Sequence, residues 1–376
     1  SLRLDPSDVF LKNLADPFEA ACNDGESFGN FRLKDCVVRG RELIDWYEAK
    51  KQMEASRKEK GRYLIGVGMA CGSHGTSMFP FMPDITGITI KMNEDGTIVF
   101  TTGTSDMGNG SVTTQCMLIS EVLGIPLDHI AYIKTDTDAA MSDLGAYASR
   151  GTYTSGHAAV KTAQIMRDKI AVLAAELLDT TTDNLDFHDD AVWCVDIHRK
   201  FVSMKEIAVH AREKHQEDLS CSYMFHSEAG PMSSGAHFAK VQVDTVTGGI
   251  KVLEYAAVHD VGRVVNPMGI TGQLEGGISM GLGYALCEEM KLDSTGRNQT
   301  SSFKKYHILN VKEMPKLSVD FLDSEEETGP YGAKSIGECA VVPVAPAIAN
   351  AVSNAVGRQF YKLPIRPEDV LEALSL

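Results

Sequence analysis

The 376-residue sequence lacks the cysteine and histidine spacings that mark protein metal sites. Its eight cysteines are scattered without a CxxC pair, and none of its eleven histidines stands at metal-ligand spacing from a cysteine. Zinc and iron–sulfur sites need such closely spaced ligands. Scattered thiols are typical of reduced cysteines in a cytoplasmic protein. We therefore expect a cytoplasmic protein that does not hold a metal with a conventional set of protein ligands.

Net positive charge and long apolar runs are lacking too. The formal net charge of −15 at pH 7 argues against nucleic acid or an anionic membrane as a partner. No apolar run is expected to reach the length of a membrane span. With 43% hydrophobic and 23% charged residues, the composition is that of a soluble globular protein. The sequence therefore predicts no nucleic-acid partner and no membrane partner.

What is present is a repeated order of strand hairpin, polar loop and helix. The first hairpin is signalled by Asp95-Gly96 between two apolar runs, and the helix expected after it covers residues 111–123. The second hairpin spans residues 238–259, and a helix is expected over 272–289. This order predicts an α+β fold of two related subdomains, each with a mixed or antiparallel sheet and packed helices.

The expected domain organisation follows from this repeat. Residues 1–60 are polar and read as a helical lead-in segment. Residues 61–220 are expected to form the first α+β subdomain, and residues 221–376 the second.

Four polar, glycine-containing loops are expected just before helices. They cover residues 103–110, 149–156, 266–277 and 329–338. Amides at a helix N-terminus favour anions, and arginine and hydroxyl donors suit phosphate oxygens. None of the loops is a Walker loop, a Rossmann fingerprint or a hydrolase elbow. Together they predict a large, phosphate-bearing ligand held by backbone and short polar groups.

The fourth loop ends in a carboxylate, Glu338, which precedes the apolar, uncharged run 339–352. A carboxylate facing apolar surroundings has a raised pKa and can act as a general base. The alternative is that Glu338 caps the following helix or forms a surface ion pair. The local pattern alone favours this alternative.

The four loops, in their order, resemble the molybdenum hydroxylases, the xanthine dehydrogenase and aldehyde oxidase family. The resemblance is to the second half of the molybdopterin-binding subunit, and it covers nearly the whole chain. The segments that carry it are Asp106–Gly110 with the helix that follows, Ala148–Thr152, Asp260–Gly277 and Gly332–Glu338.

The resemblance implies a molybdopterin cofactor, possibly in its dinucleotide form, with no protein side chain bonded to the molybdenum. It implies hydroxylation of a purine-like N-heterocycle or an aldehyde with water-derived oxygen. Glu338 matches the general base, which deprotonates the attacking oxygen. Asn109 stands where the family usually has glutamine, so it keeps the amide with one methylene less of reach. The implied cofactor-binding residues are Gly108, Asn109, Gly110, Ser149, Arg150, Gly151, Thr152, Gln273 and Gly337.

The resemblance also implies partners. The chain matches only the second half of the family's molybdenum subunit, so we expect a naturally split subunit or a piece of a longer one, inactive by itself. The expected partners are a first-half molybdopterin-binding polypeptide, iron–sulfur and flavin (FAD) subunits or domains, and a small-molecule substrate.

Two other hypotheses remain at this point. One is a non-catalytic assembly or interaction module with a decayed cofactor site, which Asn109 weakly favours. The other is a phosphate- or nucleotide-binding module of a different kind.

Overall fold

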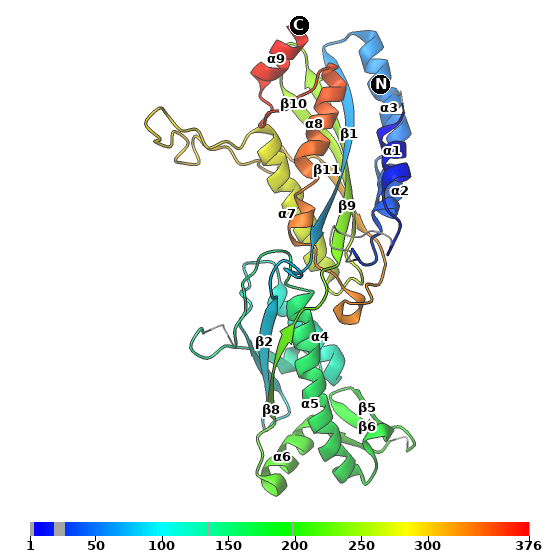
Figure 1. The fold of residues 1–376 in the computed structure, drawn as a ribbon, viewed down its shortest axis with the longest axis vertical. Helices are drawn as coiled ribbons and strands as arrows, with labels where there is room; N and C mark the ends of the chain where they lie inside the picture. Colours follow the sequence, from blue (N-terminus) through cyan, green and yellow to red (C-terminus); the bar gives the residue numbers. More distant parts are fainter. Residues whose placement is uncertain (1–3, 19–26, 134–135, 198, 376) are drawn as a thin grey trace. The chain divides into compact units, whose positions relative to one another are not determined.

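The computed structural model describes residues 4–18, 27–133, 136–197 and 199–375, and the chain forms two compact units (Figure 1). Unit 1 combines residues 1–74, 231–327 and 336–376, and unit 2 combines residues 75–230 and 328–335. Cys22, one of the scattered cysteines, lies outside the described residues. Both units contain helices and sheets, which confirms the α+β class.

These units differ from the three consecutive segments expected from the sequence. The lead-in helices belong to unit 1, because they pack on its sheet. Strand β1 (Tyr63–Gly75) pairs with β9 (Met232–Asp244), which lies far along the chain. Strand pairing across this distance makes each unit discontinuous in sequence.

The sheet of unit 1 has the order β1-β9-β10-β11. Strand β10 (Ile250–Asp260) forms an antiparallel hairpin with β9, with Ile250 opposite Val243, which confirms the second expected hairpin. Strand β11 (Lys316–Phe321) runs parallel to β10. Alternate residues of β9 and β10 enter two different hydrophobic clusters, so both faces of the sheet are covered.

Helices cover the two faces of this sheet (Figure 1). One face carries α1 (Pro6–Asn13), α2 (Leu33–Leu43) and α3 (Trp46–Glu59). The other carries α7 (Pro267–Leu286), α8 (Val344–Val356) and α9 (Pro367–Ser375).

Helix α8 lies very close to β1. Asn350 and Asn354 donate their side-chain amides to the carbonyls of Met69 and Val67, at 2.9 and 2.8 Å. The stretch Gly337–Val356 is apolar and long enough to cross a membrane by length and composition, contrary to the sequence expectation. Most of it is buried inside the structure, so its apolar character is accounted for by the core of unit 1.

Unit 2 has a main sheet with the order β4-β3-β2-β8. Strands β2 (Ile85–Met92) and β3 (Ile98–Thr102) form the hairpin expected around Asp95-Gly96. Two helices, α4 and α5, pack against each other in this unit. The remaining bounds are α4 (Ser111–Leu123), β4 (Ile130–Tyr132), α5 (Thr154–Leu178), β5 (Leu185–His188), β6 (Ala191–Cys194), β7 (Phe201–Ser203), α6 (Met204–His215) and β8 (Ser220–His226).

Candidate functional site

The first glycine loop of unit 2 folds around its own carboxylate. Asp106 accepts hydrogen bonds from the amides of Gly108, Gly110 and Val112 at 2.8, 3.4 and 3.3 Å. The φ angles of Gly108 and Gly110 are 97° and 71°, a left-handed region that glycine adopts without strain. The Asn109 side-chain oxygen accepts from the Ser111 amide at 3.3 Å, at the first residue of α4. Residues 105–108 of the loop are exposed, and the Asp106 carboxylate holds the loop in shape.

The second loop precedes α5 and carries backbone strain. Ala148 and Ser149 have φ angles of 52° and 49°, which are unfavourable for residues with a Cβ. The amides of Thr152 and Tyr153 both donate to the Ser335 hydroxyl, at 3.0 and 2.9 Å. Residues 329–335 of the fourth loop therefore join the second loop within unit 2.

The first and second loops come together at the N-termini of α4 and α5. The Thr104 hydroxyl donates to the Ser155 hydroxyl at 3.0 Å, and both side chains are buried. A methyl group on Gly151 would lie 3.9 Å from the Ser111 Cβ, at ordinary contact distance. The structure thus brings together two loops whose clustering the sequence could only suggest.

His157, in the first turn of α5, also holds residues 328–335 in place. Its Nε2–H donates to the Thr328 carbonyl at 2.7 Å, and its ring stacks on Phe225 with centroids 4.6 Å apart. Burial lowers the pKa of His157, which favours the neutral ring.

Arg150 does not fit the expected role as a cofactor ligand. Its side chain is 1% exposed, and all five N–H groups of its guanidinium are used within the protein. No donor remains for a phosphate, so Arg150 positions the loop instead. Its acceptors are Asp84, Asp143, the carbonyls of Gly145 and Ile85, and the Thr86 hydroxyl.

Two polar side chains near the loops have no partner in the described structure. Gln115 is completely buried, and neither its Nε2 nor its Oε1 makes a hydrogen bond. The buried Ser111 hydroxyl, one turn earlier on α4, is also without a partner. Buried polar atoms in native proteins are nearly always hydrogen-bonded, so the described residues leave this part of α4 unsatisfied. Gln115 could not be identified from the sequence, because the signal along this helix is apolar periodicity.

The third predicted loop is mostly helix. The Asn266 side chain accepts from the Gly269 amide at 3.0 Å and caps α7, and Pro267 occupies the first turn. Residues 272–277 therefore lie inside α7, which corrects the expectation that the helix begins at Gly272. Gln273 is half-buried on this helix.

Glu338 lies on a short 3-10 turn, η4 (Gly337–Ala340), which packs against α7 within unit 1. The neighbours Cys339 and Ala340 are buried in a small cluster with Leu274, one residue after Gln273. Glu338 itself is exposed. The described residues therefore do not enclose this carboxylate, and its expected role as a general base stays a prediction.

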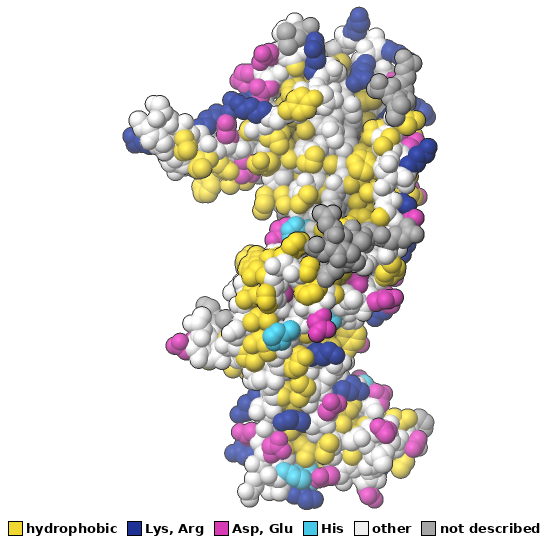
Figure 2. Space-filling view, viewed as in Figure 1, with side chains coloured by type: hydrophobic (Ala, Val, Ile, Leu, Met, Phe, Trp, Pro, Cys, Tyr) yellow, Lys and Arg dark blue, Asp and Glu magenta, His cyan; other side chains and the backbone are white. Residues whose placement is uncertain are grey.

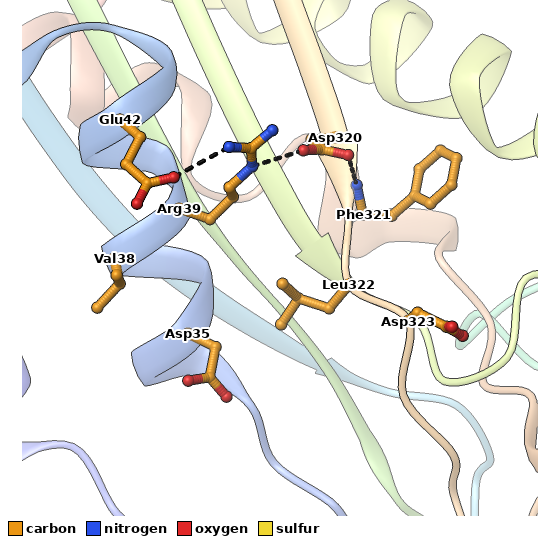
Figure 3. A pocket seen from close by; sticks show the side chains of 8 residues that line it. All are labelled: Asp35, Val38, Arg39, Glu42, Asp320, Phe321, Leu322 and Asp323. Carbon is orange, nitrogen blue, oxygen red and sulfur yellow. Dashed lines mark hydrogen bonds and ion pairs between the residues drawn. The ribbon is translucent and has the colours of Figure 1, made fainter.

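Unit 1 also has a surface groove, which differs from the glycine-containing loops because it is acidic. It lies between α2 and the end of β11, and Arg39 bridges its walls by donating to Asp320 and Glu42 at 2.8 and 2.9 Å (Figure 3). Asp35 and Asp323 add further negative charge. Four carboxylates and one guanidinium make the groove acidic, which disfavours a phosphate-bearing ligand.

Comparison with known proteins relates this chain to one protein family. The sequence matches the family "Molybdopterin cofactor-binding domain" over residues 39–315. It is 30% identical over 381 residues to a putative xanthine dehydrogenase molybdenum-binding subunit of Escherichia coli K12, with 100% of this chain and 50% of that protein covered. It is 34% identical over 350 residues to a probable hypoxanthine oxidase of the same organism, with 91% and 35% covered. The chain thus spans about half the length, or less, of these relatives.

Two solved structures share the fold. The Cu,Mo-CO dehydrogenase in its carbon monoxide reduced state superposes with a TM-score of 0.89 at 24% identity, covering 98% of this chain and 49% of that one. Quinoline 2-oxidoreductase from Pseudomonas putida 86 gives a TM-score of 0.91 at 22% identity, covering 99% and 50%. At these identities the likeness is one of fold.

Proposed function

Because the chain belongs to the molybdopterin cofactor-binding domain family, we propose that it is the cofactor-binding, base-carrying half of a molybdenum hydroxylase. The proposed reaction inserts a water-derived oxygen into a purine-like N-heterocycle or an aldehyde. The names of the two Escherichia coli relatives, a xanthine dehydrogenase subunit and a hypoxanthine oxidase, support the purine-like choice.

The observation that carries this proposal is the buried, unpartnered polar face of α4. Ser111 and Gln115 lie beside two glycine-containing loops, and none of their side-chain polar atoms has a protein partner. Leaving such atoms unpaired costs about 1–3 kcal/mol per group. These atoms are enclosed in the ligand-free chain, so a ligand rich in nitrogen and oxygen atoms, as a pterin is, would remove that penalty by drawing the two side chains out toward the loops.

The residues of the two loops would hold the cofactor through short polar contacts. We assign this role to Gly108, Asn109, Gly110, Ser149, Gly151 and Thr152, add Ser111 and Gln115, and keep Arg150 as the residue that positions the second loop. In unit 1 we assign a cofactor contact to Gln273 and close backbone approach to Gly337. The cofactor, when bound, supplies the two-electron redox chemistry, and the protein supplies orientation and electrostatics.

Glu338 is proposed as the general base, which accepts the proton of the attacking oxygen. A carboxylate becomes a stronger base when water is excluded from it. Because Glu338 is exposed in this chain, the exclusion of water would have to come from a covering segment. We therefore propose that the chain is inactive alone and that a first-half polypeptide completes the site.

Exposed apolar side chains support an additional partner surface on unit 1. Met280 and Tyr284 are exposed one turn apart on α7, Met268 is exposed in its first turn, and Phe303 and Val311 are exposed on the segment that follows it. Figure 2 shows apolar side chains at the surface over the α7 region of unit 1. Large exposed apolar groups of this kind mark interaction sites. We propose that the first-half polypeptide covers them, that iron–sulfur and FAD units complete the electron path, and that the assembly is cytoplasmic.

The test is co-expression of this chain with a first-half polypeptide from a relative, followed by measurement of molybdenum, pterin and hydroxylation of purines and aldehydes. Glu338→Gln keeps the shape of the side chain but removes the base, so we expect full molybdenum content with turnover reduced about 10²–10⁴-fold. Glu372→Gln, at an exposed glutamate of α9, is the matched control and should leave turnover unchanged.

Two results would contradict the proposal. If Glu338→Gln retained turnover, the assignment of the base would be wrong. If the assembled protein held neither molybdenum nor pterin, the cofactor-binding role itself would be wrong.

A further inference from the structure

Two histidines and a glutamate of unit 2 converge at the far end of α5 from the glycine loops. Glu176 lies in the last turn of α5, while His210 and His215 lie on α6. One ligand atom from each of the three lies within 4.8 Å of the others. Glu176 is 22 residues from the start of α5, which places it about 33 Å along the helix from the loops at 1.5 Å per residue. The cluster is therefore independent of the proposed cofactor site.

The distances in the cluster suit a small divalent ion. Glu176 Oε2 lies 3.2 Å from His210 Nε2 and 2.9 Å from His215 Nε2. Ligands bonded to Zn²⁺ at about 2.0–2.1 Å in tetrahedral geometry stand about 3.3 Å from each other. Small side-chain rotations would bring all three atoms to this spacing. Two imidazoles and one carboxylate form a ligand set that is common in zinc sites, with one position left for water.

Helix packing and helix ends fix the backbone positions of the three residues. Helix α6 begins with a capping box, in which Ser203 and Glu206 exchange hydrogen bonds, and α6 packs on α5. Gln216 ends α6 in the left-handed conformation directly after His215. Asp179 ends α5 in the same way three residues after Glu176. A preformed backbone lowers the entropy that metal binding must overcome.

The arrangement is more specific than a surface ion pair. His210 and His215 both point Nε2 at the same carboxylate oxygen, and their side chains are 15% and 34% exposed. Hydrogen bonds from His210 and then His215 lower the pKa of Glu176. Nearby Lys214 contributes positive charge that opposes cation binding, so the site is expected to be weaker than a closed structural zinc site.

We propose that Glu176, His210 and His215 form a surface site for Zn²⁺ or a related divalent transition-metal ion. The ion bridges the ends of α5 and α6 and keeps one coordination position for water. Sequence spacing gave no sign of this site, because Glu176 stands 34 residues before His210.

Equilibrium dialysis of the full chain against Zn²⁺, with metal content read by mass spectrometry, tests the proposal. We expect the double variant His210→Ala/His215→Ala to bind one zinc ion fewer per chain, with affinity at this position weakened about 100-fold or more. The matched control is His129→Ala, since His129 is partly exposed and lies 3.2 Å from the Asp190 carboxylate, outside the cluster. The control should keep the full zinc content.

Thermal melting separates loss of the site from loss of the fold. Without zinc, the double variant should melt at the temperature of the parent, and added Zn²⁺ should raise the melting temperature of the parent only. Co²⁺ should give visible d–d bands without a thiolate charge-transfer band, since no cysteine belongs to the site. Equal zinc binding by parent and double variant would overturn the proposal. Molybdenum content should be the same in all variants, whatever the outcome for the cofactor site.

Discussion

Two neighbouring parts of unit 2 differ in whether their buried polar groups are hydrogen-bonded. At Arg150 every guanidinium N–H has an acceptor, and the carboxylates of Asp84 and Asp143 are buried against it. On α4, Ser111 and Gln115 are buried with no acceptor or donor at all. Both parts adjoin the same glycine-containing loops.

This difference separates side chains that stabilise the fold from side chains that we assign to ligand binding. A network in which every polar atom is hydrogen-bonded fixes a defined geometry, and breaking it costs much free energy. Unpaired buried polar atoms, by contrast, lower the stability of the protein until a ligand binds them. We therefore expect substitutions at Arg150 to act on folding, and substitutions at Gln115 and Ser111 to act on cofactor retention. Substitutions in the two parts measure how sharp that division is.

The largest effect is expected from Arg150→Met. The variant leaves two buried carboxylates without their counter-ion, and removal of one partner from a buried charge pair destabilises proteins by about 3–5 kcal/mol. Urea unfolding of the cofactor-free chain measures the change. Arg39→Met is the control, because Arg39 makes an ion pair at the surface with side chains about half exposed, and should change stability by less than about 1 kcal/mol. Equal effects of the two variants would refute the division.

A third buried polar group, in unit 1, predicts a pH dependence. His237 hydrogen-bonds Tyr255 at 2.8 Å and His259 at 2.6 Å, and all three are buried. Burial lowers the pKa of His259 to about 3 and that of His237 well below 6.5. The unfolded chain therefore binds protons that the folded chain does not, so stability is complete above about pH 6.5 and falls as the pH is lowered toward 3.

The expected loss is about 1.4 kcal/mol per histidine for each pH unit below 6.5. Urea unfolding at pH 7.5, 6.5 and 5.5 measures it, at pH values where surface carboxylates contribute little. The double variant His237→Gln/His259→Gln should flatten the profile. An unchanged slope in that variant would show that other groups cause the acid sensitivity.

The sequence was sufficient to predict those helices and strands that local sequence signals define. Helix α4 matches its predicted bounds, 111–123, because glycines in the left-handed conformation stand at both ends. Helix α7 begins five residues earlier than predicted, since Asn266 and Pro267 are start signals that were assigned to a loop. The discontinuous units were not predictable in this way, because they follow from pairing of β1 with β9.

The candidate site shows more clearly that local sequence signals do not reveal contacts between distant parts of the chain. A glycine-rich loop with an arginine is equally consistent with phosphate binding and with an internal network, and only the distant Asp84 decides between them. The buried face of α4 includes the polar residues Ser111, Thr114 and Gln115 beside its apolar ones. Hydrophobic periodicity cannot detect a helix face whose buried members are polar.

Gln115→Leu is the next test of the comparison. Leucine has a similar size and removes both unpaired polar atoms, so the cofactor-free chain should become more stable by about 1–3 kcal/mol. The co-expressed assembly should lose molybdenum and pterin. Urea unfolding of the cofactor-free chain and metal analysis of the assembly give the two readouts. A destabilised cofactor-free chain would mean that Gln115 has a structural partner and not a ligand.

Ser111→Ala has the smallest expected effect and the closest control. Ser111 and Ser77 are both 6% exposed, but Ser77 donates to Asp84 at 2.9 Å, whereas the Ser111 hydroxyl has no partner. Ser77→Ala should destabilise the cofactor-free chain by about 1.5–3 kcal/mol, since it loses a hydrogen bond to a charged group. Ser111→Ala should leave its free energy of unfolding unchanged or raise it by less than about 1 kcal/mol. The two serine-to-alanine substitutions are made at equal burial, so they compare a hydroxyl that the protein already satisfies with one that it does not. A similar loss of stability at both positions would place Ser111 in the structural network with Arg150.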